Sequence, residues 1–251
     1  MSTTPLTDSA IMLRRNFKHT LRNPVTVFNA ILFPIVLMLM FVYVFGDSFA
    51  VGVDYIDYAT PGLILMAVSY GLSATSTAVN SDMTKGIINR FRVMDVSRGA
   101  VLTGHVVATV VRTLVAVAAV IGVAFLMGFS PSGTFADWLG AIGVLVLAIF
   151  AVTWFAIALG LAAKTAESAG FATVPLIMLP FFSSAIVPAG NMGPGVREFA
   201  EYQPFTSIIE SLRGFLAGTP SAGDTTAAIA WSVGIALVGY LWARARFTRR
   251  A

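Results

Sequence analysis

Cysteine is absent from this chain of 251 residues, which excludes disulfides, thiolate metal sites and cysteine nucleophiles. Charge is also scarce: Asp, Glu, Lys and Arg make up 11% of the residues, whereas a soluble domain carries about 25%. Apolar residues make up 57%. This balance predicts an integral membrane protein and leaves no room for a sizeable water-soluble domain.

Motifs for nucleotides, metals and catalysis are missing as well. The nearest approach to a Gly-x-x-x-x-Gly-Lys-Ser/Thr phosphate loop starts at Gly160, and it lacks the second glycine before Lys164. His19 and His105 have no metal-ligand neighbour at helical spacing. No serine–histidine or paired-carboxylate pattern supports an enzyme. We therefore expect this chain to bind no cofactor or metal and to catalyse no reaction itself.

Six apolar runs are long enough to cross a bilayer, since a hydrocarbon core about 30 Å thick needs about 20 apolar residues per helical span. They cover residues 25–45, 58–79, 106–128, 137–163, 168–187 and 225–243. The first run is too long for a cleavable signal peptide and lacks a small-residue cleavage site, so we expect it to remain as the first span. The sequence thus predicts one all-α transmembrane domain over residues 1–251.

Basic residues gather in alternate connections, which predicts the orientation of the spans. Every Lys and Arg except Arg112, Arg197 and Arg213 lies in the N-terminal segment, the second–third connection, the fourth–fifth connection or the C-terminal segment. The opposite face holds Asp47, Asp54, Asp57, Asp137, Glu198, Glu201, Glu210 and Asp224. Both termini are therefore expected in the cytoplasm. A nucleic-acid partner is not expected, because it would need a soluble basic face.

Two segments are neither spans nor simple loops. Residues 7–22 are amphipathic, and their basic and apolar site candidates are Arg14, Arg15, Phe17, Lys18 and Arg22. They fit a helix lying in the inner interface or a positive anchor that fixes topology, and the two readings are compatible. Residues 188–218 predict two short helices, 194–202 and 204–217, which re-enter from the outward face and pack on the bundle.

Polar side chains inside the spans leave two alternatives open. The second run has a stripe at helical spacing, formed by Ser69, Ser73, Ser76, Thr77 and Asn80. It fits either helix–helix contacts or a substrate path. In the third run, His105 and Arg112 share one helical face.

Arg112 lies about 24 Å from the outer end of the third run, so we expect it to snorkel to the inner interface as a structural anchor, with a transport role as the alternative. Because no Asp or Glu lies deep in any run, a proton- or sodium-coupled mechanism is poorly supported.

A basic, amphipathic segment over residues 82–98 joins the second and third runs. On a helix, Ile87, Phe91 and Met94 form an apolar edge suited to a groove in a partner protein. Arginines flank this edge and suit an acidic rim. The alternative is an interfacial helix that binds lipid headgroups alone.

The same segment carries a resemblance. Residues 86–98 read Gly-Ile-Ile-Asn-Arg-Phe-Arg-Val-Met-Asp-Val-Ser-Arg, which resembles Gly-Ile-Ile-Asp-Arg-Phe-Arg-Ser-Met-Pro-x-Ser-Arg in the daunorubicin-resistance-type branch of the ABC-2 type exporter permeases. A second match reads Phe-Ser-Ser-Ala-Ile-Val-Pro over residues 182–188, followed by Met192, Tyr-Gln-Pro-Phe-Thr over 202–206, and Leu-Arg over 212–213. Asp95 and Gly193 depart from this pattern, where the family has prolines; Asp82 stands where it has glutamate.

The resemblance implies an ABC-2 type exporter fold and a permease subunit of an ATP-driven exporter in the plasma membrane. It implies a homodimer of this chain with two copies of a separate ATPase subunit, which binds ATP and Mg²⁺. The residues expected to dock or couple to that ATPase are Asp82, Gly86, Ile87, Arg90, Phe91, Arg92, Met94 and Arg98.

The expected substrate is lipophilic or amphiphilic: a drug or antibiotic, a lipid or a glycan. Its contacts would come from the first, second and fifth spans. A stand-alone secondary carrier or channel is the alternative function, and a membrane-embedded enzyme comes third.

Overall fold

The computed structural model describes residues 24–49, 51–84 and 98–250. Every regular element within these residues is a helix. The amphipathic segment 7–22 and most of the segment 82–98 lie outside the described residues, so the predictions placed there stay predictions.

Four long helices form the body of the protein: α3 (Tyr55–Thr84), α5 (Arg98–Leu126), α6 (Phe135–Ala162) and α11 (Ala222–Arg250). Each contains a stretch long and apolar enough to cross a membrane. They correspond to the second, third, fourth and sixth predicted runs. A Thr134–Asp137 capping box defines the start of α6, because each side chain binds the other's backbone amide.

The first predicted run is a helix with an irregular end. It forms α2 (Pro24–Leu39), continues through a π-helical turn, η1 (Met40–Val44), and is followed by the short 3-10 helix η2 (Gly46–Ser48). Pro34 lies inside α2. Together α2 and η1 run without a break from Pro24 to Val44, which is about the length of one span.

The fifth run differs most from its prediction as one kinked helix over 168–187. It consists of α7 (Ala166–Phe171), α8 (Val174–Met178) and the 3-10 helix η3 (Leu179–Phe182), followed by irregular backbone. Pro175 and Pro180 both occupy first-turn positions, where proline's missing N–H is tolerated. These prolines therefore restart the helix instead of merely bending it.

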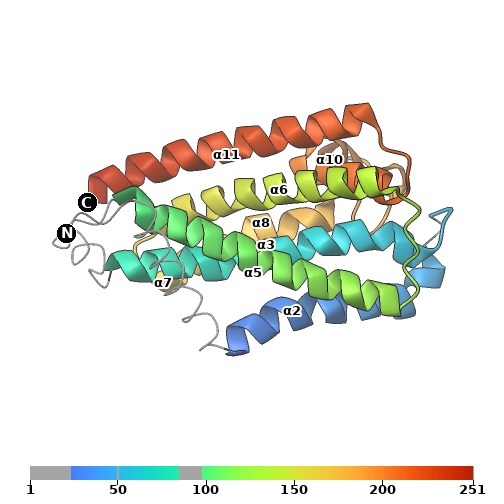
Figure 1. Cartoon of the computed structure of the whole chain (residues 1–251), viewed down its shortest axis with the longest axis horizontal. Helices are drawn as coiled ribbons and strands as arrows, with labels where there is room; N and C mark the ends of the chain where they lie inside the picture. The colour runs from blue at the N-terminus through green and yellow to red at the C-terminus, as the bar shows by residue number, and fades with distance from the viewer. Residues whose placement is uncertain (1–23, 50, 85–97, 251) are drawn as a thin grey trace.

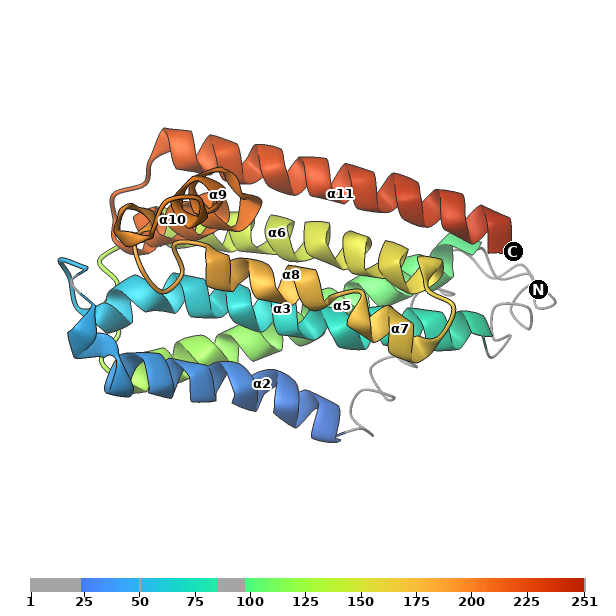
Figure 2. The same ribbon diagram turned by 180° about the vertical axis from the view of Figure 1, so that it is seen from behind.

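Helix α3 lies at the centre of the bundle, with α2, α5, α6 and the α7–α8 segment around it (Figure 1, Figure 2). In the most apolar stretch of α3, 72% of the residues are buried inside the protein. The share is 28% in α11, which packs on the far side of α6. The α6–α11 approach is close because Gly239 has no side chain: a Cβ there would lie 2.7 Å from the backbone nitrogen of Phe155. Helix α3 is thus the element that most of the others contact.

The buried apolar residues form two clusters. The larger fills the space between α3, α5, α6 and α10. The smaller, which we call the inner-end cluster, consists of Val79, Leu102, Val106, Ile157, Ala158, Leu161, Ala243 and Phe247. It joins the last turns of α3, α6 and α11 to the first turns of α5.

Two short helices close the opposite end of the bundle. They are α9 (Val196–Tyr202) and α10 (Pro204–Leu216), and a single 3-10 turn, η4 (Ala189–Asn191), precedes them. Their bounds lie within two residues of those expected from the sequence. Figure 2 shows them at the end of the bundle away from the C-terminal turns of α11.

Candidate functional site

An irregular segment, residues 183–188, crosses the first turns of α3. It comes so close that a Cβ on Gly62 would lie 2.5 Å from the Cα of Ala185. Two tyrosines of α3 donate to its carbonyls: Tyr58 Oη to the Ser184 oxygen at 2.9 Å, and Tyr55 Oη to the Ile186 oxygen at 3.1 Å. Non-helical backbone inside a membrane bundle needs such partners, and α3 supplies them.

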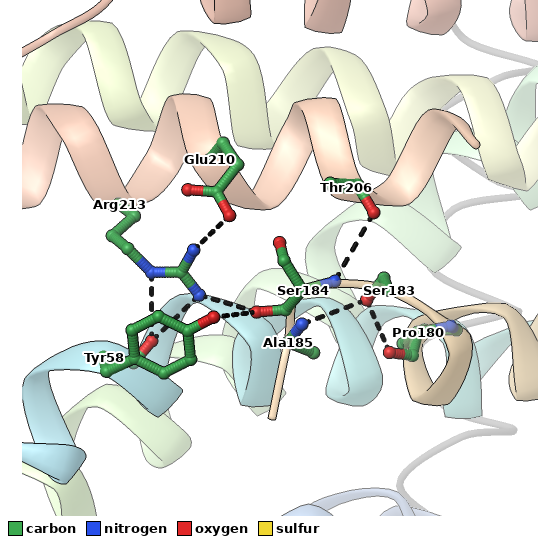
Figure 3. A network of polar contacts seen from close by, with 8 residues as sticks. All are labelled: Tyr58, Pro180, Ser183, Ser184, Ala185, Thr206, Glu210 and Arg213. Atoms are coloured by element: carbon green, nitrogen blue, oxygen red, sulfur yellow. Dashed lines mark hydrogen bonds and ion pairs between the residues drawn. The ribbon is translucent and has the colours of Figure 1, made fainter. Parts of the chain in front are cut away.

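Arg213 of α10 joins this segment to α3 (Figure 3). Its Nη2 donates to the Ser184 oxygen at 2.9 Å and to the Tyr58 oxygen at 3.1 Å, while its Nε donates to the Tyr58 oxygen at 3.2 Å. The guanidinium also stacks on the Tyr58 ring and pairs with Glu210. Three chain segments are therefore held by one side chain.

Further bonds fix the same segment. Ser183 Oγ donates to the Pro180 oxygen and accepts the Ala185 N–H at 3.2 Å (Figure 3). Gln203 Nε2 donates to the carbonyls of Leu179 and Phe182, each at 3.1 Å. Within the second resemblance, Phe182 and Ser184 thus meet Gln203, Thr206 and Arg213 in space. We call this arrangement the Arg213 clamp.

The polar stripe of α3 mostly contacts the backbone where α6 ends and α7 begins. Ser76 Oγ donates to the Ala169 oxygen at 2.9 Å, and Thr77 Oγ1 to the Ala166 oxygen at 3.4 Å. Asn80 Nδ2 donates to the carbonyls of Gly160 and Ala163, at 2.9 and 2.7 Å.

The other two members of the stripe behave differently. Ser69 Oγ donates within its own helix, to the Leu65 oxygen. Ser73 is half-buried, as is Thr77, and both hydroxyls face Gly170 of α7. The structure therefore gives Ser76, Thr77 and Asn80 interhelical bonds and leaves Ser73 and Thr77 partly accessible.

A line of hydrogen-bonding groups runs between α3 and α5, and we call it the α3–α5 seam. It consists of the Gly71 carbonyl, Thr75 and Asp82 on α3, and of His105, Thr109 and Arg112 on α5. Thr75 and Thr109 hydrogen-bond through their hydroxyls at 3.0 Å. Arg112 Nη2 donates to Thr75 Oγ1 at 2.8 Å and to the Gly71 oxygen at 3.1 Å. The expectation that Arg112 extends to the inner interface is wrong, because its guanidinium binds mid-helix atoms of α3.

At the inner end of the seam, His105 Nε2 lies 3.1 Å from Asp82 Oδ2. Both side chains are largely buried, at 9% and 14% exposure. The pair joins the two helices that flank residues 85–97. His105 and Arg112 share one face of α5, as predicted, and that face contacts α3.

Only part of the expected docking site lies within the described residues. Asp82 is on the last turn of α3, and Arg98 is the first residue of α5. The rest, Gly86, Ile87, Arg90, Phe91, Arg92 and Met94, lies outside, as do Arg14, Arg15, Phe17, Lys18 and Arg22. Sequence reasoning missed Tyr58 and Thr109, whose partners lie on other helices. Arg213 was noted only as part of a motif.

No group of three His, Asp or Glu side chains that would hold a metal occurs in residues 24–49, 51–84 and 98–250. The polar contacts there bind backbone or one another across helices. What this arrangement offers is a mechanically linked bundle, with the Arg213 clamp at one end and the Asp82–His105 pair at the other.

Comparisons with known proteins identify the family of this chain. The profile of the ABC-2 type transporter family matches residues 8–216. The daunorubicin resistance ABC transporter permease protein DrrB1 of Streptomyces coeruleorubidus is 31% identical over 224 residues, which cover 88% of this chain and 78% of that protein. The probable doxorubicin resistance ABC transporter permease protein DrrC of Mycobacterium tuberculosis is 29% identical over 228 residues, covering 86% and 79%. The chain therefore belongs to the ABC-2 type transporter family, whose members are membrane-embedded permeases that work with a partner ATPase subunit.

Proposed function

We propose that this chain is the membrane-spanning permease subunit of an exporter in the plasma membrane, energised by a separate ATPase that binds ATP and Mg²⁺. The observation that carries the proposal is the family match over residues 8–216, shared with permeases named for drug resistance. The scarcity of acidic residues within the helices supports it, because a carrier driven by protons or sodium usually keeps them there.

The proposed topology has six spans, with both termini in the cytoplasm. Helix α2 with η1 is the first span, and the broken α7–α8–η3 segment is the fifth. Charge supports this orientation. Lys164, Arg244 and Arg246 lie at the end of the bundle where α6 and α11 finish, whereas Asp57 and Asp137 lie at the end where α3 and α6 begin. Helices α9 and α10 then cap the outward face.

Residues 82–98 are the proposed docking segment, with Phe91 at the centre of its apolar edge. Both flanks of this segment rest on the inner-end cluster, and the Asp82–His105 pair joins them. A push on the segment would therefore reach α6 and α11 through packed side chains, because close-packed interiors transmit displacement. Two copies of the chain with two ATPase subunits form the proposed assembly.

The proposed substrate is lipophilic or amphiphilic, and the names of the relatives favour a drug or antibiotic over a lipid or glycan. Ser73 and Thr77 are the proposed contacts on α3, because both are half-buried between α3 and α7. The exposed apolar side chains of α2 and α8, among them Phe33, Val36 and Met178, suit lipid, the second copy or a lipophilic substrate.

The test is co-purification of this chain with a co-expressed nucleotide-binding subunit from the same organism, followed by measurement of ATP hydrolysis. The wild-type pair should co-purify, and substrate should stimulate its ATPase activity. Phe91→Asp should abolish both while leaving membrane insertion intact. Leu126→Asp is the matched control, since Leu126 is an exposed apolar residue at the other end of α5. Equal ATPase coupling in the Phe91→Asp protein would overturn the docking role.

A further inference from the structure

Arg112 is a charge placed in the middle of a transmembrane helix. Helix α5 runs from Arg98 to Leu126, so Arg112 is its central residue, about 21 Å from either end. Its contacts on α3, Gly71 and Thr75, are also near the midpoint of that helix. An arginine at this depth costs free energy and is retained in membrane proteins mainly for function.

No carboxylate of the neighbouring helices neutralises this charge. Helices α2 and α5 contain no Asp or Glu in their sequences, and α3 contains only Asp57 and Asp82. Measured along α3 from Gly71, these lie about 21 Å and 16 Å away. Asp57 binds Ser130, and Asp82 pairs with His105. Within residues 24–49, 51–84 and 98–250, the guanidinium of Arg112 is thus hydrogen-bonded to two neutral acceptors and to no carboxylate.

The Arg112 guanidinium also has N–H groups that its bonds to α3 do not use. Arginine has five N–H donors, and both bonds to α3 use Nη2. The N–H groups of Nε and Nη1 find no acceptor in the described part of the chain. The side chain is half-buried, not sealed in the core. Both guanidinium edges that could bind an anion with two parallel bonds include Nη2, so the N–H groups of Nε and Nη1 can each donate one charge-assisted hydrogen bond to a carboxylate, sulfonate or phosphate.

We propose that Arg112 is an anion-binding subsite, which receives the acidic group of a lipophilic substrate at the level of Thr75. The acidic headgroups of membrane lipids stay at the interface, too far from the centre of α5 to serve as the ligand. Calling the ligand a substrate rests on the proposed function. The binding itself does not, because it requires neither the ATPase nor ATP.

The experiment measures binding of 11-(dansylamino)undecanoic acid and of its neutral methyl ester to the full chain in phosphatidylcholine nanodiscs. Energy transfer from the protein's four tryptophans to the dansyl group reports binding to protein, not lipid. Arg112→Gln should weaken binding of the acid about tenfold or more, since it removes a charge-assisted pair, and leave binding of the ester unchanged. Arg244→Gln is the control for loss of a positive charge, because Arg244 is exposed on α11.

Equal affinity of the wild-type and Arg112→Gln proteins for the acid would overturn the proposal, as would an equal loss with Arg244→Gln. If Arg112→Gln does not fold, shown by loss of ester binding, Arg112→Lys decides. Lysine keeps the charge but has one nitrogen that must serve both α3 and the ligand, so the acid should bind several-fold more weakly while the ester binds normally. Unchanged acid binding by the lysine variant would contradict the subsite. Failure of ATP-driven transport would bear on the proposed function alone.

Discussion

The guanidinium carbon of Arg213 lies 3.8 Å from the centre of the Tyr58 ring, and the same guanidinium donates to the carbonyl of Tyr58. One residue of α3 is therefore held by α10 through both its ring and its backbone. Because Ser184 is bound by the same two side chains, the irregular segment 183–188 cannot leave α3 without breaking contacts to α10.

Replacement of Arg213 should loosen this end of the bundle. Arg213→Ala removes three charge-assisted bonds and the ring contact, and leaves Glu210 without its partner, so we expect a loss of about 2–3 kcal/mol in stability. Arg213→Lys should recover part of the loss, because lysine keeps the charge without the fork. Thermal unfolding in detergent measures both. A melting temperature unaffected by Arg213→Ala would contradict a stabilising role for the Arg213 clamp.

Gly160 should tolerate no side chain. A Cβ there would lie 2.4 Å from the backbone oxygen of Ser76, so Gly160→Ala must push α3 and α6 apart, at a cost of about 1–3 kcal/mol. Gly143 lies on the same helix with nothing within 4 Å of its Cβ position. Gly143→Ala should be neutral or slightly stabilising, because alanine favours helix. Similar melting temperatures for the two variants would contradict the close crossing.

Asn80 should stabilise the connection between α6 and α7. Its amide donates to the carbonyls of Gly160 and Ala163, and Asn80→Ala leaves both without this partner. We expect a loss of about 1–2 kcal/mol. Ser69→Ala is the control, since Ser69 donates only within its own helix. Hydrogen exchange of residues 163–170 should accelerate in the Asn80 variant alone, and equal exchange in both would argue against the connection.

His105 should matter for coupling more than for folding. His105→Leu breaks the pair with Asp82 at the base of the docking segment, so substrate should stimulate the ATPase less, with little change in melting temperature. His105→Arg places an N–H donor opposite Asp82 and should restore much of the stimulation. The measurement is substrate-stimulated ATP hydrolysis by the co-purified complex. If leucine and arginine give the same result, the contact with Asp82 is not the relevant feature of His105.

The long helices were predictable because their signal is local. A run such as 137–163 is apolar over almost its whole length after Asp137, and α6 begins and ends within two residues of it. Helices α9 and α10 could also be predicted from the sequence, since Pro204 at the first turn of α10 marks its start. The fifth run was not, because hydropathy does not report that Pro175 and Pro180 each begin a new short helix.

The contacts of the site depend on tertiary structure and could not be read from spacing. The sequence placed Arg112 and His105 on one face of a helix, but which partner that face meets depends on the packing of α5 against α3. Arg213 and Tyr58 are 155 residues apart, and no local pattern connects them. Motif resemblance grouped Ser184 with Arg213 without indicating that they touch.

The central claim is tested most directly in inverted membrane vesicles that contain this chain, its partner ATPase or both. Accumulation of a fluorescent lipophilic drug should require both proteins and ATP, and Phe91→Asp should reduce it to the level of vesicles without the permease. Accumulation by this chain alone, driven by a proton gradient and indifferent to ATP, would contradict the account.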